Sequence, residues 1–147
     1  MTYVAAASRE TLRQRAAVLA AVRTFFAERG VLEVETPALS HSGVTDPVLE
    51  SVRAQAKSLG SNPLFLQTSP EFAMKRLLAT GSGDIYQICR VFRDDELGRW
   101  HQPEFTLLEW YRVGWDERQL MREVQALLET AMVAGGAHGE RRCVSIR

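Results

Sequence analysis

Residues 92–105 read FRDDELGRWHQPEF, and this stretch with its two flanks decides the fold. Runs prone to form β-strands lie on either side, 85–93 before the polar segment 94–103 and 105–112 after it. Two such runs around a polar segment predict an antiparallel hairpin with an extended loop. A loop of that length inside a compact domain is usually functional, so the hairpin is the first place to look for a site.

The hairpin carries groups suited to binding a nucleotide. Arg93 closes the first run, Arg99 and His101 lie in the loop, and Phe105 opens the returning run. The guanidinium group of arginine is a planar fork of donors that matches phosphate or carboxylate oxygens, and an aromatic face can hold a base. On spacing alone, an exposed hairpin with solvated charges and one packed ring explains these residues equally well.

An amphipathic helix is predicted near the start of the chain. Apolar residues recur at helical spacing over 9–29, where Ser8 can cap the start and Gly30 can end the helix in a left-handed turn. Residues 31–36 then favour a short strand, which Pro37 stops. The apolar face of the helix is formed by Leu12, Ala16, Leu19, Val22 and Phe26.

A second strand and helix are predicted before the hairpin. Residues 64–67 favour a strand, and the helix that follows ends near Gly81. Thr68 or Ser69 can cap this helix, and Pro70 fits its first turn, where a missing N–H costs nothing.

The remaining signals are weaker. Residues 40–47 are rich in turn formers, and 48–54 favour a strand. An amphipathic helix is predicted over about 116–132. Three tryptophans are expected to be packing residues: Trp100, Trp110 and Trp115.

The composition is that of an ordinary globular domain, with 46% hydrophobic and 24% charged residues among 147. Lys+Arg and Asp+Glu each number 18, so the net charge gives no sign of a nucleic-acid partner. Cys89 and Cys143 lack metal-ligand spacing and favour reduced thiols. The sequence shows neither a signal peptide nor an apolar run of about 18 residues, so a cytoplasmic, soluble protein with no membrane contact is expected.

Three segments, taken together, resemble one known family. One stretch closely resembles motif 2 of the class II aminoacyl-tRNA synthetases in its lysyl form, with FR-x-D at 92–95 and R-x-H-x-PEFT-x-x-E-x-Y at 99–111. Residues 30–37 and the preceding helix resemble motif 1, the dimer-forming element of that class. Residues 68–78 resemble the start of the amino-acid-binding helix that lies between those motifs.

The resemblance implies an α+β fold, in which an antiparallel sheet is flanked by helices. It also implies that residues 1–147 are the N-terminal part of a single catalytic domain, with motif 1 at about 9–37 and motif 2 at about 85–112. The chain ends at Arg147, before motif 3 could appear, so the chain alone is expected to be inactive.

Within the lysyl group, the resemblance is closest to the branch that charges a lysine of elongation factor P instead of tRNA. Lysyl-tRNA synthetases carry an N-terminal OB-fold for the anticodon, whereas only residues 1–8 precede the first predicted helix here. The implied reaction uses ATP and Mg²⁺, with the Mg²⁺ ligands in the missing C-terminal part. Lysine or (R)-β-lysine becomes an aminoacyl-adenylate, and the aminoacyl group passes to elongation factor P. A homodimer is implied. A minimal lysyl-tRNA synthetase and a non-catalytic synthetase-like module that only dimerises or binds ligand remain as alternatives.

The resemblance also implies roles for individual residues. Arg93 is the implied catalytic residue, which bridges the α-phosphate of ATP and the amino-acid carboxylate. Glu71 would receive the substrate ammonium, and Tyr111 would lie near the substrate side chain with Glu109 beside it. The implied ATP-binding residues are Arg93, Asp94, Asp95, Arg99, His101, Gln102 and Phe105. The implied substrate-binding residues are Ser69, Pro70, Glu71, Glu109 and Tyr111.

Simpler explanations stand beside these roles, and the chain departs from the family pattern at two positions. Arg93 could form a structural ion pair and Phe105 could pack in the core, while Ser69 and Glu71 also suit the start of any helix. Asp95 stands where the class has glutamate, and Gln102 stands where the lysyl form has asparagine. Both changes alter the reach of a polar group by one methylene.

Overall fold

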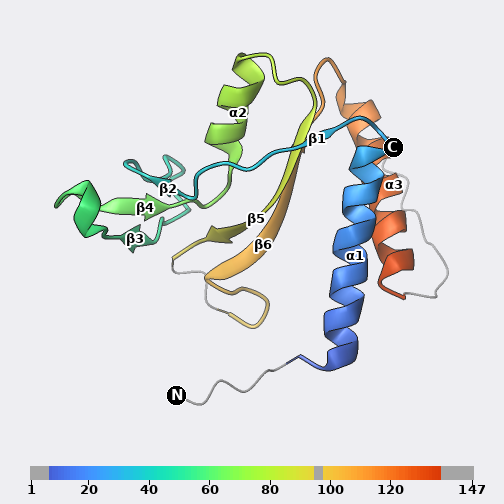
Figure 1. Cartoon of the computed structure of the whole chain (residues 1–147), viewed down its shortest axis with the longest axis horizontal. Coiled ribbons are helices and arrows are strands. Elements are labelled where there is room, and N and C mark those ends of the chain that lie inside the picture. The colour runs from blue at the N-terminus through green and yellow to red at the C-terminus, as the bar shows by residue number, and fades with distance from the viewer. Residues whose placement is uncertain (1–6, 95–97, 137–147) are drawn as a thin grey trace. The chain divides into compact units, whose positions relative to one another are not determined.

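The structure is a computed structural model that describes residues 7–94 and 98–136. It divides into two compact units, one made from Met1–Gly30 and Gly114–Arg147 and the other from Val31–Val113 (Figure 1). Each unit has its own elements and is described by itself.

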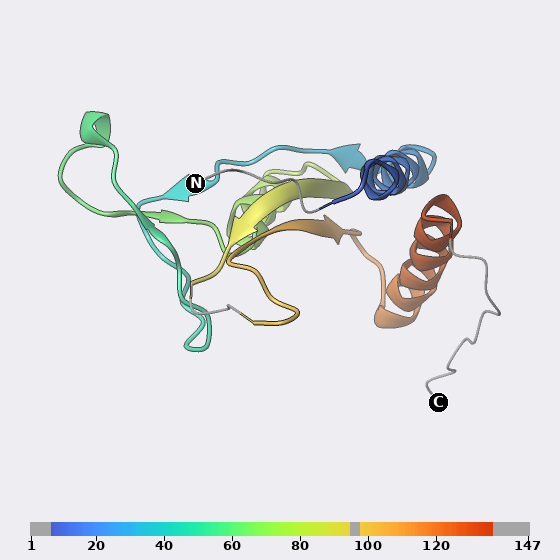
Figure 2. The ribbon, with the colours of Figure 1, turned by 90° about the horizontal axis from the view of Figure 1, so that it is seen from below.

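The first unit contains helices α1 (Arg9–Ala27) and α3 (Glu117–Ala134), which lie side by side in Figures 1 and 2. Ser8 caps α1 by accepting a hydrogen bond from the Thr11 N–H, and Gly30 has a φ of 68°. A capping box formed by Asp116 and Gln119 begins α3. Both predicted helices and the predicted ends of α1 are therefore confirmed.

The buried face of α1 differs from the predicted one near the start of the helix. Leu12 is 54% exposed, so it is not a core residue of the described unit. The buried side chains instead gather near the C-terminal end of α1, where Phe25 and Phe26 form an edge-to-face ring pair with centroids 5.3 Å apart. Burial of a phenylalanine contributes about 1.5–3 kcal/mol, so this end holds most of the packing energy of the helix.

The second unit is built on a three-stranded sheet in the order β1-β5-β6. Strands β5 (Ile85–Phe92) and β6 (Glu104–Tyr111) form the predicted antiparallel hairpin. The predicted strand 31–36 is reduced to β1 (Leu32–Glu33), which pairs with β5 in parallel. Only Leu32 and Glu33 pair with β5, at its first two residues. The length of β1 therefore depends on how far it runs beside β5, a strand distant in the sequence.

A smaller antiparallel sheet, in the order β2-β4-β3, lies at the far end of this unit. It consists of β2 (Leu39–Ser40), β4 (Leu64–Leu66) and β3 (Arg53–Ala54), with a 3₁₀ turn over Lys57–Leu59. The predicted strand 64–67 is confirmed within one residue, whereas the predicted strand 48–54 survives only as β3 and an isolated bridge between Glu50 and Asp94. The helices and largely antiparallel strands of the described residues confirm the α+β class.

Helix α2 (Glu71–Ala79) follows β4 as predicted, but its start differs in detail. Pro70 occupies the N-cap position, and the side-chain oxygen of Ser69 accepts a hydrogen bond from the Glu71 N–H over 3.1 Å. Ser69 thus supports the first turn from outside the helix. Pro70 itself is fully buried, and its carbonyl accepts a hydrogen bond from the Met74 N–H.

The register of the hairpin decides which side chains share a face. Gln87 lies opposite Glu109, and Val91 lies opposite Phe105. Directly paired residues project to the same side of an antiparallel sheet, and alternate residues of one strand do so as well. Phe105, Glu109 and Tyr111 therefore lie along a single face of β6.

Candidate functional site

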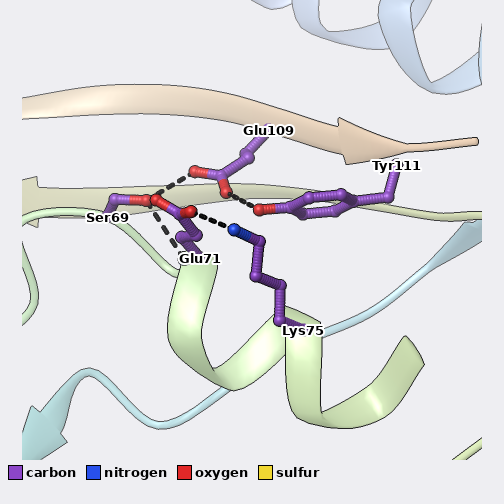
Figure 3. A network of polar contacts seen from close by, with 5 residues as sticks. All are labelled: Ser69, Glu71, Lys75, Glu109 and Tyr111. Atoms are coloured by element: carbon purple, nitrogen blue, oxygen red, sulfur yellow. Dashed lines mark hydrogen bonds and ion pairs between the residues drawn. The ribbon is translucent and has the colours of Figure 1, made fainter. Parts of the chain in front are cut away.

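A carboxylate held by two hydroxyl groups forms the centre of the site (Figure 3). The Ser69 hydroxyl donates to one oxygen of Glu109 over 2.6 Å, and the Tyr111 hydroxyl donates to the other oxygen over 2.6 Å. Ser69 comes from the junction of β4 and α2, whereas Glu109 and Tyr111 come from β6. The structure thus brings together three residues that the sequence assigned to one substrate pocket.

A second carboxylate stands beside the first. Glu71, the first residue of α2, forms an ion pair with Lys75 one helical turn later. Figure 3 shows this pair on the same side of the sheet as Glu109 and Tyr111. The Glu71 charge is close enough to Tyr111 to influence the pKa of its phenol. Two carboxylates and a phenol therefore face a common space between α2 and β6.

The electrostatics of this space keep Tyr111 protonated. Burial raises the pKa of the Tyr111 phenol, and the hydrogen bond to Glu109 and the charges of Glu109 and Glu71 raise this pKa further. Burial also raises the pKa of the Cys89 thiol, and the Glu109 charge adds to this rise, while hydrogen bonds from Gln87 and Gln67 oppose it. The site therefore favours neutral hydroxyl and thiol groups around a negative centre.

Arg93 and Phe105 lie together at the other end of the same face. The guanidinium carbon of Arg93 lies 5.1 Å from the centroid of the Phe105 ring, within the range of a cation–π contact. The Arg93 side chain donates from Nε to the Thr68 carbonyl over 3.3 Å, and its backbone N–H donates to the Pro103 carbonyl. Two side-chain contacts thus orient the guanidinium group, and the backbone bond holds Arg93 at the start of the hairpin loop, as predicted.

The segment Gln67–Ser69 connects the two halves of the site. The Gln67 carbonyl accepts from the Phe92 N–H over 2.9 Å, and its side-chain amide donates to the Arg90 carbonyl over 2.9 Å. The next two residues contact Arg93 and Glu109 as described above. Sequence reasoning missed Gln67, because a glutamine at the end of a short strand gives no signal of a tertiary contact.

The described loop residues 98–102 are exposed. Gly98 and His101 exchange two backbone hydrogen bonds, so Arg99 and Trp100 form the tip of a tight turn. Trp100 is 82% exposed, and the Arg99 guanidinium carbon lies 4.9 Å from the centroid of its ring. The expectation that Trp100 packs is wrong, because the tip of this turn projects it into solvent.

Three other predicted ATP-binding residues are also exposed: Asp94, His101 and Gln102. Asp94 is held through its backbone N–H, which donates to the Glu50 carbonyl over 2.9 Å. His101 and Gln102 are exposed, so the structure leaves their side chains at the surface of the loop. Asp95 lies outside the described residues, and its predicted role stays a prediction.

Gln87 is a further polar residue that the sequence did not single out. Its side chain is 2% exposed, and its amide oxygen accepts a hydrogen bond from the Thr36 hydroxyl over 3.0 Å. A glutamine within an apolar β-prone run is the signal that could have found it, because buried polar groups need a partner. Gln87 thus ties the segment after β1 to β5, at the position that pairs with Glu109.

The described residues contain no group of metal ligands and no helix suited to a membrane. No group of three or more His, Cys, Asp or Glu side chains there could hold a metal ion. No helix in residues 7–94 and 98–136 is long and apolar enough to cross a membrane.

The α+β fold agrees with the result of comparison with known proteins. Over residues 1–141 the chain matches the family described as tRNA synthetases class II (D, K and N), and it belongs to that family. The resemblance inferred from the three motifs is confirmed.

The chain is similar to proteins named elongation factor P–(R)-β-lysine ligase. It is 52% identical to the protein of Vibrio atlanticus (strain LGP32) over 139 residues, which are 92% of this chain and 43% of the relative. It is 55% identical to that of Vibrio parahaemolyticus serotype O3:K6 (strain RIMD 2210633) over 89% of this chain and 42% of the relative. It is 49% identical to that of Enterobacter sp. (strain 638) over 92% of this chain and 43% of the relative. The chain therefore spans about two fifths of the length of these relatives.

Proposed function

We propose that the chain is the N-terminal part of a single catalytic domain that activates lysine or (R)-β-lysine with ATP. The aminoacyl group then passes to a lysine side chain of elongation factor P. The observation that carries this proposal is the pair of carboxylates, Glu71 and Glu109, that share one space with the protonated phenol of Tyr111.

The amine side of the site suits a ligand with two ammonium groups. An ammonium group has three donors and no acceptor, so it needs carboxylate or other oxygen partners around it. Glu71 is assigned to one ammonium and Glu109 to the amine of the substrate side chain. Because Ser69 and Tyr111 hold both Glu109 oxygens, this carboxylate keeps one orientation as the amine enters. Pro70 frames the pocket from its buried position.

The nucleotide side is assigned to Arg93 and Phe105. The ring of Phe105 offers a face for adenine, and stacking of a base on an aromatic ring contributes about 1–3 kcal/mol. Arg93, already within 5.1 Å of that ring, is placed to bridge the α-phosphate and the substrate carboxylate. Asp94, Asp95 and Gln102 are assigned to the adenosine, and Arg99 and His101 to the outer phosphates.

The proposed chemistry needs positioning and charge stabilisation rather than a general base. An oxygen of the substrate carboxylate attacks the α-phosphorus, the bond to the bridging oxygen breaks, and pyrophosphate leaves with the aminoacyl-adenylate formed. Arg93 stabilises the negative charge that grows on the phosphorus oxygens. The neutral amine of the acceptor lysine then attacks the acyl carbon, AMP leaves, and the nitrogen loses a proton to water.

Mg²⁺ belongs to the proposal as the ion that neutralises phosphate charge in phosphoryl chemistry. The described residues contain no cluster of three or more His, Cys, Asp or Glu side chains that fits it. A homodimer belongs to the proposal as well, with the α1 and β1 region as its interface.

The choice of acceptor separates the proposal from a minimal lysyl-tRNA synthetase, and amino-acid activation separates it from a non-catalytic module. The test uses the chain extended by the C-terminal portion that its relatives contain. ATP–pyrophosphate exchange is measured with L-lysine and (R)-β-lysine, and aminoacyl transfer is measured to elongation factor P and to lysine tRNA. Exchange followed by transfer to elongation factor P supports the proposal. Efficient charging of tRNA would favour the minimal lysyl-tRNA synthetase, and absence of exchange with either amino acid would favour the non-catalytic module.

A further inference from the structure

The two carboxylates of the site are satisfied in different ways. Glu109 is held by two hydroxyl groups that carry no charge, each at 2.6 Å. Glu71 is held by the ammonium group of Lys75, a residue of its own helix. The carboxylate assigned to a substrate ammonium is therefore already paired with an ammonium in the ligand-free chain (Figure 3).

Lys75 is free to leave this position. Its side chain is 56% exposed, and that of Glu71 is 47% exposed, so the pair lies at the solvent edge of the site. A lysine side chain is a flexible four-carbon stem with a strongly hydrated head, and it regains water when it turns away. An exposed pair at this helical spacing is weak, so an entering cation can displace it.

We propose that Lys75 limits the affinity of the site for cationic ligands, because it is an internal counter-ion of Glu71 that an incoming substrate ammonium must displace. The proposal rests on the assignment of Glu71 as an ammonium acceptor. A ligand that brings its own ammonium replaces the lost pair and leaves Glu71 neutralised. A ligand without a cation at that point leaves Glu71 paired with Lys75 and gains no ion pair with this carboxylate. Lys75 thus weakens the binding of ligands that place a cation at Glu71.

A simpler explanation is that the pair only stabilises α2. A glutamate four residues before a lysine supports many surface helices. The two explanations predict opposite effects on binding, because loss of a helix-stabilising pair at the edge of a site weakens ligand binding, whereas loss of a competitor strengthens it.

The experiment compares K75M, K75Q, R76M and E71Q in the chain extended to the length of its relatives. KM and kcat for L-lysine are measured by ATP–pyrophosphate exchange, and the dissociation constant for L-lysine is measured by titration calorimetry. Loss of the competing pair is expected to lower KM and the dissociation constant about two- to fivefold in K75M and K75Q, with the gain in KM rather than kcat. Arg76, next to Lys75 in the same helix, points about 100° around the helix axis, so R76M removes the same charge from another face.

The outcomes distinguish a failure of the Lys75 proposal from a failure of the proposed function. Unchanged or weaker lysine binding in both Lys75 variants would overturn the inference. An equal gain in R76M would also overturn it, because the effect would then be one of net charge alone. E71Q is expected to lose most lysine binding. Normal binding in E71Q, or no binding in the unmodified protein, would remove the proposed function and this inference with it.

Discussion

Ser69 and Glu109 are separated by 40 positions in the sequence, yet a hydrogen bond of 2.6 Å joins their side chains. The bond ties the start of α2 to β6, and it fixes one oxygen of Glu109 while Tyr111 fixes the other. Hydrogen bonds to a charged group contribute more than neutral ones, about 1.5–3 kcal/mol each. The carboxylate is thus oriented before any ligand arrives.

The phenol of Tyr111 should make the stability of the chain depend on alkaline pH. Its pKa is raised in the folded chain, chiefly by burial, so the folded state holds this proton more tightly than the unfolded state. The stabilisation is complete below the ordinary tyrosine pKa of about 10 and is lost as the pH rises above that value. Tyr111→Phe should therefore show a shallower fall in stability between pH 9 and 11 (about one pH unit on either side of that pKa).

Urea denaturation of the unmodified chain and of Tyr111→Phe across this range provides the measurement. Cys89, whose pKa is also raised by burial, is present in both proteins and serves as the common background. Parallel curves for the two proteins would show that Tyr111 does not titrate differently on folding.

The hairpin could be predicted from the sequence because its signals are local. Two β-prone runs and a polar connection define it, and the observed strands begin and end within a residue or so of the predicted limits. Once the strands are known, alternation places Phe105, Glu109 and Tyr111 on one face. The roles of these residues are implied by the resemblance to the family motifs.

The contacts between segments could not be predicted in this way. The length of β1 depends on how much of β5 it meets, and the bond between Ser69 and Glu109 depends on how α2 is set against the sheet. The prediction that Trp100 packs fails because a large aromatic side chain favours burial on average, whereas the geometry of a tight turn exposes this one.

Asp84 should be a main determinant of the stability of the second unit. Its carboxylate accepts from the Arg112 side chain over 3.0 Å and from the Val113 N–H over 2.7 Å, so it closes the end of the hairpin opposite the loop. The side chains of Arg112 and Asp84 are 8% and 28% exposed. Loss of one partner from a buried pair costs about 3–5 kcal/mol, so Asp84→Ala should cost about 2–3 kcal/mol at this partial exposure.

Asp46→Ala is the matched control, because the exposed Asp46 carboxylate accepts only a local hydrogen bond, from the Val48 N–H over 3.0 Å. It should cost less than about 1 kcal/mol. Urea denaturation followed by circular dichroism gives both values, and hydrogen exchange should show faster exchange at the end of β6 in Asp84→Ala. Equal costs in the two variants would contradict the anchoring role.

Arg93→Ala should abolish adenylate formation in the chain extended to the length of its relatives. Removal of a preorganised donor at a developing negative charge costs about 10²–10³ in kcat. Arg90→Ala is the control. The Arg90 side chain lies on the face of β5 opposite to Val91 and forms an exposed ion pair of 3.6 Å with Glu104. ATP–pyrophosphate exchange measures both. Near-normal exchange in Arg93→Ala would remove the catalytic assignment and leave Arg93 as a structural residue that binds the Thr68 carbonyl.

Phe105→Ala should weaken the binding of ATP more than the binding of lysine. The ring lies at the Arg93 end of the face, whereas the carboxylates lie at the other end, so its loss removes the adenine platform and spares the amine pocket. A stacked base contributes about 1–3 kcal/mol, which corresponds to a 5- to 150-fold rise in the dissociation constant for ATP. Phe72→Ala removes an equivalent ring that is 54% exposed on α2, and it should leave ATP binding close to normal. Separate calorimetric titrations with ATP and with L-lysine in the extended chain measure these effects. A larger loss for lysine than for ATP would place the ring in the amine pocket, and equal small losses in both variants would make Phe105 a packing residue.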